Sequence, residues 1–236
     1  MFEGPFGEGI IKRGKNKGLL EINTYDIRGY AKDRHRTVDD APFGGGPGML
    51  MKPEPIFDGV EDIINKQKLP DSTPIVLMSP QGESFNQKIA EDATRYTDII
   101  LICGRYEGVD ERVRNHLATR EISIGDYVLG GGEIPAMVVI EAVSRLTVGV
   151  VGSIESTEDD TFTTGLIQHP QYTRPSVYRD WSVPNVLLSG NHLEVEKWRR
   201  RESLKKTIQR RPDLLETTPL TDDDLKLINQ LKPELG

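Results

Sequence analysis

Polar, glycine-flanked loops follow three short apolar runs of this chain and hold many of the side chains that could do chemistry. The runs end at Met78, Cys103 and Ile124, and the loops after them carry serine, arginine, tyrosine, glutamate and aspartate. Each junction alone fits an ordinary turn between strands. Three junctions in succession, each with glycine and two with tyrosine, favour parallel strands that end at one crevice. In open α/β sheets, ligands bind in such a crevice, at the carboxyl ends of the strands.

A second glycine-dense loop spans residues 43–49, with the sequence Phe-Gly-Gly-Gly-Pro-Gly-Met. Glycines suit either a flexible linker or a place where another group comes close to the backbone. The flanking Phe43, Met49, Leu50 and Met51 are unusual for a solvated linker. We therefore expect another group to approach the backbone closely at this loop.

Metal and hydrolase chemistry find little support in the sequence. The four histidines, His35, His116, His169 and His192, lie scattered, without the spacing of zinc ligands. The single cysteine, Cys103, excludes a disulfide framework and a multi-cysteine zinc site. In a strand, such a cysteine is most often a buried, small apolar side chain. The chain contains neither a GxSxG elbow nor a Walker loop.

Composition and charge indicate a folded protein with one basic stretch. The 236 residues are 36% hydrophobic and the net charge is −7, so a packed core is feasible and a generally nucleic-acid-coated surface is not expected. Residues 197–211 nevertheless carry eight Lys and Arg against a single acid, Glu202. Such a run is either a solvated helix face or a contact for phosphates, because charges act within about 10 Å.

The chain shows no targeting or membrane signal. No signal peptide opens it, and no apolar run approaches membrane-spanning length. We therefore expect a cytoplasmic protein without a membrane partner.

Hydrophobic periodicity places the polar loops on an α/β framework with a parallel sheet. Strands are expected at 19–25, 74–78, 98–103 and 121–124, and helices within 5–17 and at 55–66, 84–96, 109–117, 135–148 and 192–210. A last helix is expected to start near Thr221, because threonine followed three residues later by an acid is typical of an N-cap. The polar, acidic stretch 152–165 predicts a domain boundary. We expect one domain at 1–151, a mobile linker at 152–167 and a small helical domain at 168–236.

Five motifs follow one another over nearly the whole chain. They are Asp39-Asp40 with the glycine-dense loop 43–49, and then residues 103–108, 123–129, 131–133 and 172–175. One glycine-rich loop would be weak evidence, whereas five motifs in register are specific. Together they resemble the motifs of bacterial tRNA (guanine-37-N1)-methyltransferases, the TrmD type of the SPOUT class.

This resemblance implies a fold, a cofactor and partners. The parallel sheet would carry a trefoil knot that holds S-adenosylmethionine, next to the small helical C-terminal domain. The enzyme would be a homodimer whose active sites are shared between the subunits, and it would bind the anticodon stem-loop of tRNA. Magnesium would support catalysis, through ligands that the sequence does not identify.

Two features depart from the family pattern. Family members usually begin with a strand that ends in a Phe-Pro motif, whereas this chain starts at Met1-Phe2-Glu3-Gly4, just after that strand. The methyltransferase domain is therefore expected to lack the usual first strand. Gln168 stands where many members carry an acid before the motif at 172–175, so a cofactor contact made by that acid does not carry over.

The resemblance assigns the proton chemistry to Asp160 and Arg145. Guanine N1 is a weak nucleophile while it carries its proton, so methyl transfer needs a general base and a positive group near the adjacent carbonyl oxygen. Asp160 would be the base and Arg145 its partner. Judged from the residues alone, Asp160 is one of many solvated linker acids, and Arg145 is a cation at the C-terminal end of a helix.

The resemblance also implies the binding residues. Cofactor contacts are expected from the three strand-end loops and the start of the next helix: Leu77, Met78, Ser79, Pro80, Gly104, Tyr106, Glu107, Gly108, Ser123, Ile124, Gly125, Tyr127, Leu129, Gly131, Gly132 and Pro135. Among them, the Glu107 carboxylate suits the ammonium group or the ribose hydroxyls. Substrate contacts are expected from the glycine-dense loop, the linker and the basic helix: Asp39, Gly45, Gly48, Ser156, Arg199, Arg200 and Lys205.

The activity expected from the resemblance is methyl transfer from S-adenosylmethionine to N1 of the guanine at tRNA position 37, with guanine 36 as context. Two alternatives stay open. A SPOUT ribose 2′-O-methyltransferase would not need the linker carboxylate as a base, and a catalytically silent RNA-binding protein would leave no mark on the RNA.

Overall fold

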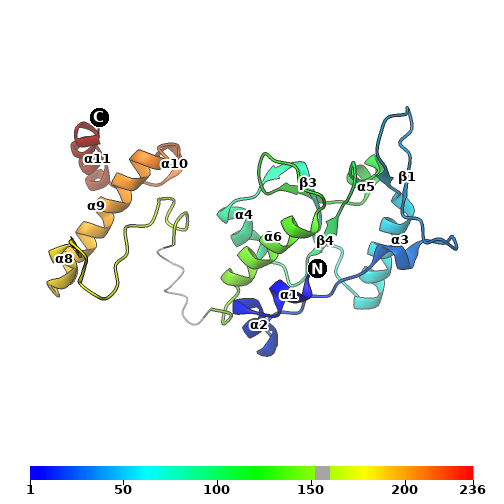
Figure 1. Cartoon of the computed structure of the whole chain (residues 1–236), viewed down its shortest axis with the longest axis horizontal. Coiled ribbons are helices and arrows are strands. Elements are labelled where there is room, and N and C mark those ends of the chain that lie inside the picture. Colours follow the sequence, from blue (N-terminus) through cyan, green and yellow to red (C-terminus); the bar gives the residue numbers. More distant parts are fainter. Residues whose placement is uncertain (152–159, 236) are drawn as a thin grey trace. The chain divides into compact units, whose positions relative to one another are not determined.

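The structure, a computed structural model, describes residues 1–151 and 160–235. The chain divides into two compact units, Met1–Gly152 and Ser153–Gly236, which run from blue to green and from yellow to red in Figure 1. The first unit contains the parallel sheet of a mixed α/β fold, and the described part of the second unit is mostly helical. None of the helices in the described ranges is long and apolar enough to cross a membrane.

Three parallel strands confirm the predicted sheet of the first unit. β3 (Ile75–Ser84) lies between β4 (Ile100–Cys103) and β5 (Arg120–Ser123). The register of β3 and β4 pairs Leu77 with Ile102. Because the three strands run in the same direction, the loops that follow them leave at the same edge of the sheet. The polar loops found in the sequence therefore meet at one crevice.

The central strand β3 leaves the sheet and returns to it. Met78 and Glu83 both pair with Ile122 of β5, and the register shifts between them, so residues 79–82 loop out of the pleated surface. A side chain on Gly82 would overlap the backbone of Ile122. Glycine is required where the loop passes so close to β5.

Helices cover both faces of the sheet. α3 (Pro53–Gln67) and α5 (Glu111–His116) pack against one face, and α4 (Gln87–Ala93) and α6 (Glu133–Leu146) pack against the other. All four lie where the hydrophobic periodicity predicts helices. The sheet is thus buried between two helical layers, as is usual for parallel strands.

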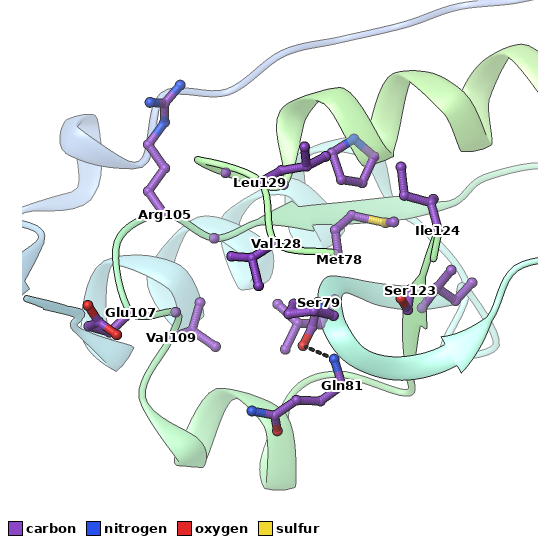
Figure 2. A pocket seen from close by; sticks show the side chains of 18 of the residues that line it. Met78, Ser79, Gln81, Arg105, Glu107, Val109, Ser123, Ile124, Val128 and Leu129 are labelled. Atoms are coloured by element: carbon purple, nitrogen blue, oxygen red, sulfur yellow. Dashed lines mark hydrogen bonds between the residues drawn. The ribbon is translucent and has the colours of Figure 1, made fainter. Parts of the chain in front are cut away.

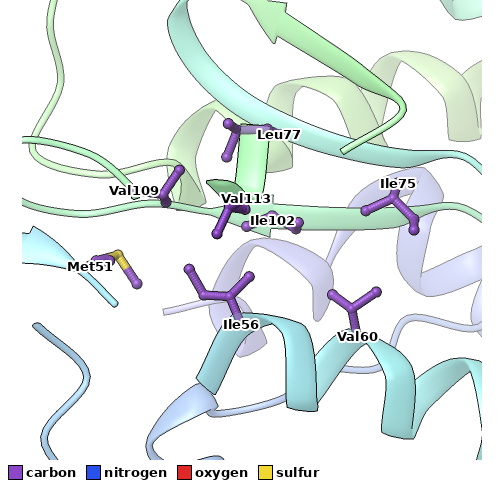
Figure 3. Close-up of a cluster of buried hydrophobic side chains, with 8 residues drawn as sticks. All are labelled: Met51, Ile56, Val60, Ile75, Leu77, Ile102, Val109 and Val113. Carbon is purple, nitrogen blue, oxygen red and sulfur yellow. The ribbon is translucent and has the colours of Figure 1, made fainter. Parts of the chain in front are cut away.

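Two hydrophobic clusters form the core of the first unit. Side chains alternate along a strand, so Ile75 and Leu77 of β3 face the cluster with α3 and α5, and Val76 and Met78 face the cluster with α4 and α6. Figure 3 shows the buried residues of the first cluster: Met51, Ile56, Val60, Ile75, Leu77, Ile102, Val109 and Val113. The second contains Val76, Met78, Ile89, Ile122, Ala136 and Val139.

The strand predicted at residues 19–25 is wrong. Helix α2 (Gly9–Asn16) forms within the predicted range 5–17 and is preceded by a short helix α1 (Glu3–Phe6) that the sequence pattern does not predict, but residues 20–26 contain no regular structure. They border a groove of about 1020 Å³, which also runs along the edge of β4 that faces away from β3. Alternating apolar residues form a strand only when a neighbouring strand takes up their backbone hydrogen bonds. No described segment does so for residues 19–25.

The second unit is built on two long helices. α9 (His192–Arg210) has the predicted bounds, and α11 (Asp222–Leu235) starts next to the predicted cap, Thr221. The short helices α8 (Asn185–Leu188) and α10 (Leu214–Thr217) pack against α9. The described part of the second unit is thus mostly helical.

The core of the second unit joins α9 and α11 to the segment that precedes them. Its buried residues are Leu166, Leu204, Ile228 and Leu231. Leu166 is fully buried, and the N–H of Ile167 donates to the hydroxyl of Thr207 at 3.0 Å. The described part of the predicted linker, residues 160–167, therefore includes positions that pack into this unit.

Candidate active site

A pocket of about 190 Å³ lies where residues 77–81 of β3, including part of its looped-out segment, face the loops after β4 and β5 (Figure 2). Every residue that the sequence nominates for cofactor contact lines this pocket, from Leu77 in β3 to Pro135 in α6. Further lining residues were not nominated: Gln81, Arg105, Val109, Arg114, Ile122 and Val128. Gln81, Arg105 and Val128 belong to the same loops, so their positions in the sequence could have identified them too. Arg114 reaches the pocket from α5, and no motif in the sequence around it indicates a binding residue.

The loop after β5 is held by hydrogen bonds within itself. The N–H of Gly125 donates to the hydroxyl of Ser123 at 3.2 Å, and the N–H of Tyr127 donates to the carbonyl of Gly125 at 2.9 Å. The Tyr127 hydroxyl donates back to the carbonyl of Ile124 at 3.3 Å. Gly125 has a φ of +147°, which glycine adopts without strain. This loop therefore presents backbone groups to the pocket in a fixed conformation.

The loop after β4 is tied to the glycine-dense segment. The N–H of Glu107 donates to the carbonyl of Met49 at 3.1 Å, and the N–H of Met51 donates to the carbonyl of Gly108 at 3.0 Å. Tyr106 has a left-handed φ of +59°, which costs a non-glycine residue roughly 1–2 kcal/mol. Tyr106, with its strained backbone, and Glu107, whose backbone N–H is hydrogen-bonded, thus line one wall of the pocket.

The glycine-dense loop is the tip of a short hairpin. β1 (Asp39–Asp40) pairs antiparallel with β2 (Leu50–Met51), so Asp39 stands at the base of the hairpin and Gly45 near its tip. A Cβ on Gly48 would lie 2.6 Å from both Cγ and Oε1 of Glu107. The predicted close approach therefore occurs at Gly48. The glycines at 44–46 face open space.

The start of α6 is joined to the loop after β4. Nε of Arg105 donates to Oε1 of Glu133 at 2.6 Å, and the N–H of Gly132 donates to the carbonyl of Gly104 at 2.8 Å. A Cβ on Gly132 would lie only 2.8 Å from Cα of Cys103. Glycine at this position therefore lets α6 begin directly against the floor of the pocket.

Cys103 does not supply a nucleophile. Burial, followed by the negative charge of Glu133, raises the pKa of its thiol to about 12. Since the thiolate is the reactive form, Cys103 stays protonated at neutral pH. It behaves as the small apolar side chain that its place in a strand predicts.

The residues nominated for proton transfer belong to different units. Arg145 lies in the last turn of α6, in the first unit, and Asp160 lies at the start of the described part of the second unit. Ser156, nominated for substrate contact, lies outside the described residues. Each of the two charged residues is therefore described only within its own unit.

The basic helix α9 uses one of its arginines inside the second unit. The Arg200 guanidinium donates two hydrogen bonds of 2.7 Å to Asp224, which is only 4% exposed. Asp224 also accepts from the N–H and hydroxyl of Thr221, so it caps α11 in a capping box. Arg200 and these bonds hold the pKa of Asp224 well below its usual value. Arg199 is exposed and Lys205 is half-buried on the same helix.

The chain is similar to a family of RNA-modifying enzymes. A family model described as "tRNA (Guanine-1)-methyltransferase TrmD" matches residues 1–217. Relatives named tRNA (guanine-N(1)-)-methyltransferase occur in Dehalococcoides mccartyi strain CBDB1, 54% identical over 234 residues, and in Dictyoglomus turgidum, 54% identical over 235 residues. A relative of the same name in Staphylococcus epidermidis strain ATCC 12228 is 49% identical over 235 residues. The matches cover 99%, 100% and 100% of this chain and 94% of each relative.

Proposed function

The chain belongs to the tRNA (Guanine-1)-methyltransferase TrmD family, and we propose that this tRNA guanine-N1 methyltransferase modifies the guanine at position 37, with guanine 36 as context. The observation that carries the proposal is the pocket between residues 77–81 of β3 and the loops after β4 and β5, lined by every residue nominated for cofactor contact. Family membership does not favour the ribose 2′-O-methyltransferase or the silent RNA-binding protein. Because its substrate is tRNA, we place the enzyme in the cytoplasm.

S-adenosylmethionine is the methyl donor that membership implies, and the pocket residues fit it. Three loops rich in glycine offer backbone donors and acceptors, which suit the edge of an adenine ring, and Leu77 and Met78 offer apolar surface. The Glu107 carboxylate suits the ammonium group or the ribose hydroxyls. When bound, the sulfonium supplies an electrophilic methyl group.

Asp160 accepts the N1 proton of guanine in this proposal, and Arg145 stabilises the charge that grows on the adjacent carbonyl oxygen. We also propose, from the family resemblance, a homodimer whose active sites use both subunits.

Three parts of the chain contact the substrate in this proposal: the glycine-dense hairpin, Ser156 and helix α9. The hairpin with Asp39, Gly45 and Gly48 and the residue Ser156 surround the target nucleotide. Arg199 and Lys205 of α9 contact phosphates of the anticodon stem-loop, as cations on a nucleic-acid interface do. Arg200 supports this surface from inside, since its guanidinium is bonded to Asp224.

The family resemblance also implies a trefoil knot in the sheet and a magnesium ion that supports catalysis, and we include both in the proposal. The knot is proposed from the family resemblance, in a sheet whose central strand loops out at 79–82 and passes close to β5 at Gly82. No group of three or more His, Cys, Asp or Glu side chains gathers for a metal ion within residues 1–151 and 160–235. The described residues thus do not form a magnesium site built of protein carboxylates.

Primer extension on a tRNA transcript tests the proposal. Incubation with enzyme and S-adenosylmethionine should produce a reverse-transcriptase stop at position 37, because a methyl group on N1 blocks the Watson–Crick edge. A transcript with adenine at 37 should give no stop and serves as the control. Ribose methylation hardly stops the polymerase, and a silent binder leaves no mark, so absence of the stop would reject the assignment.

A further inference from the structure

A small hairpin in the second unit exposes two aromatic rings. β6 (Val177–Tyr178) pairs antiparallel with β7 (Trp181–Ser182), and Tyr178 stands opposite Trp181. Their ring centroids are 6.2 Å apart, and the two residues are 56% and 67% exposed. A tyrosine and a tryptophan so widely exposed next to each other offer a flat, polarisable surface to a partner.

An arginine completes this surface. Arg179 occupies the first position of the two-residue turn with a φ of +54°, where two-residue hairpin loops usually carry glycine, asparagine or aspartate. Its guanidinium carbon lies 5.3 Å from the centre of the Tyr178 ring and 5.9 Å from the centre of the Trp181 ring. The Arg179 backbone is therefore strained, while its guanidinium lies against both rings, where cation–π attraction stabilises it.

The hairpin contributes nothing to the core of its unit. Residues 171–182 are all exposed, and the buried cluster draws on Leu166, Leu204, Ile228 and Leu231 instead. A two-stranded hairpin is at best marginally stable in water, so its exposed aromatic pair is not explained by folding of the unit. The short helix α8 follows directly and packs against the basic helix α9.

We propose that Tyr178, Arg179 and Trp181 form a base-stacking contact for an unpaired nucleotide of the tRNA substrate. The rings stack on the base, and the Arg179 guanidinium binds a neighbouring phosphate. Aromatic side chains beside cations are the means by which proteins hold single-stranded nucleic acid. A protein partner is less well matched, because a cation lies over both rings and a second arginine, Arg174, is close in sequence. The proposal rests on the tRNA substrate of the proposed function.

Tryptophan fluorescence tests the contact directly, since the chain has two tryptophans. In the Trp198→Phe variant, emission comes from Trp181 alone and should be quenched by tRNA with the same midpoint as binding measured by filter retention. The Trp181→Phe variant, which keeps only Trp198, should show a much smaller change. Unchanged Trp181 emission in a variant that binds and methylates tRNA would overturn the proposal. If the unaltered protein binds tRNA but does not methylate it, while Trp181 is still quenched in the variant, the proposed function is overturned and the stacking contact is not.

Affinity measurements separate stacking from simple apolar contact. Trp181→Leu should weaken tRNA binding about tenfold at both low and high salt, whereas Trp181→Phe should restore most of the affinity. Arg179→Gln should flatten the salt dependence, because a phosphate contact is lost. Leu188→Ala, which alters a 59% exposed side chain on the adjacent α8, is the matched control and should bind normally.

Two further measurements distinguish tRNA stacking from misfolding of the variants and from a contact between subunits. Circular dichroism melting of each variant shows whether the second unit folds, and the fluorescence test does not require a change in the hairpin. If Trp181→Leu binds tRNA as the parent does but sediments as a smaller species, the hairpin is a contact between subunits, and the base-stacking assignment is wrong.

Discussion

Replacing Gly48 with alanine should weaken cofactor binding by displacing Glu107. Gly48 has a φ of +91°, and a Cβ there would lie 2.6 Å from Cγ and Oε1 of Glu107. An alanine must therefore adopt a left-handed backbone conformation and also push the glutamate side chain aside. Glu107 is the proposed partner of the cofactor ammonium or ribose hydroxyls, so the substitution disturbs the pocket from outside it.

The expected size of the effect follows from the contact that is lost. A hydrogen bond to a charged group contributes about 1.5–3 kcal/mol, so Gly48→Ala should raise the Kd for S-adenosylmethionine roughly 10- to 150-fold. Gly45→Ala is the matched control, because Gly45 has a φ of +81° but a Cβ added to it would meet no atom within 4 Å. Backbone strain of about 1 kcal/mol is common to both variants. The control should therefore lose stability and keep its cofactor affinity.

Isothermal titration calorimetry with S-adenosylmethionine, in the absence of tRNA, measures the difference. The same substitution in a Glu107→Ala background should have no further effect on the Kd, since contacting residues are not additive. Equal losses of affinity in Gly48→Ala and Gly45→Ala would refute the reasoning. So would a further loss in the Glu107→Ala background.

Four substitutions and one chemical treatment test the remaining assignments. Asp160→Ala should lower turnover by about 10²- to 10⁴-fold and leave cofactor affinity nearly unchanged by calorimetry; a large loss of affinity would contradict its role as a base. Asp224→Asn should destabilise the protein by about 2 kcal/mol at pH 7. Because the folded pKa of Asp224 is depressed, this stabilisation is complete above the unfolded pKa near 3.9 and is lost as the pH falls towards the folded pKa. The difference in thermal unfolding should therefore be constant above about pH 5 and shrink as the pH falls below about 4, and a difference that stays constant down to pH 3 would exclude the ion pair as its cause. Arg199→Gln should weaken tRNA binding more at low salt than at high salt with an unchanged Tm, whereas Arg200→Gln should lower the Tm; the reverse pattern would exchange their roles. Cys103 should react with iodoacetamide at pH 8 at least about a hundredfold more slowly than in the unfolded chain, and similar rates would show that its thiol is not held protonated.

Much of the first unit could be predicted from local sequence because local forces decide it. The three apolar runs become β3, β4 and β5, and the glycine-flanked loops after them line one pocket. Parallel direction alone brings these loops to the same edge of the sheet. The threonine and the acid at the start of α11 likewise cap it as predicted, since the capping bonds span only three residues.

Local sequence patterns do not predict contacts between segments that lie far apart in the chain. Periodicity predicted a strand at 19–25, but no described segment of the chain pairs with it. The basic run suggested that Arg200 faces solvent, yet its guanidinium is bonded to Asp224, which follows two helices later. Composition cannot tell a solvated arginine from a paired one, because the partner lies far along the chain.

The amino-acid sequence reveals which chemical groups are available: glycine-flanked loops at strand ends, a hairpin dense in glycine and a helix rich in arginine and lysine. How each group is used follows from the packing of the folded chain. It separates Gly48, which meets Glu107, from Gly45, which meets open space, and it turns residues 177–182 into an exposed aromatic hairpin with Arg179 over both rings. The physical reason is that backbone preferences and hydrophobic periods act over a few residues, whereas close approach, burial and pairing are set by packing between segments far apart in the chain.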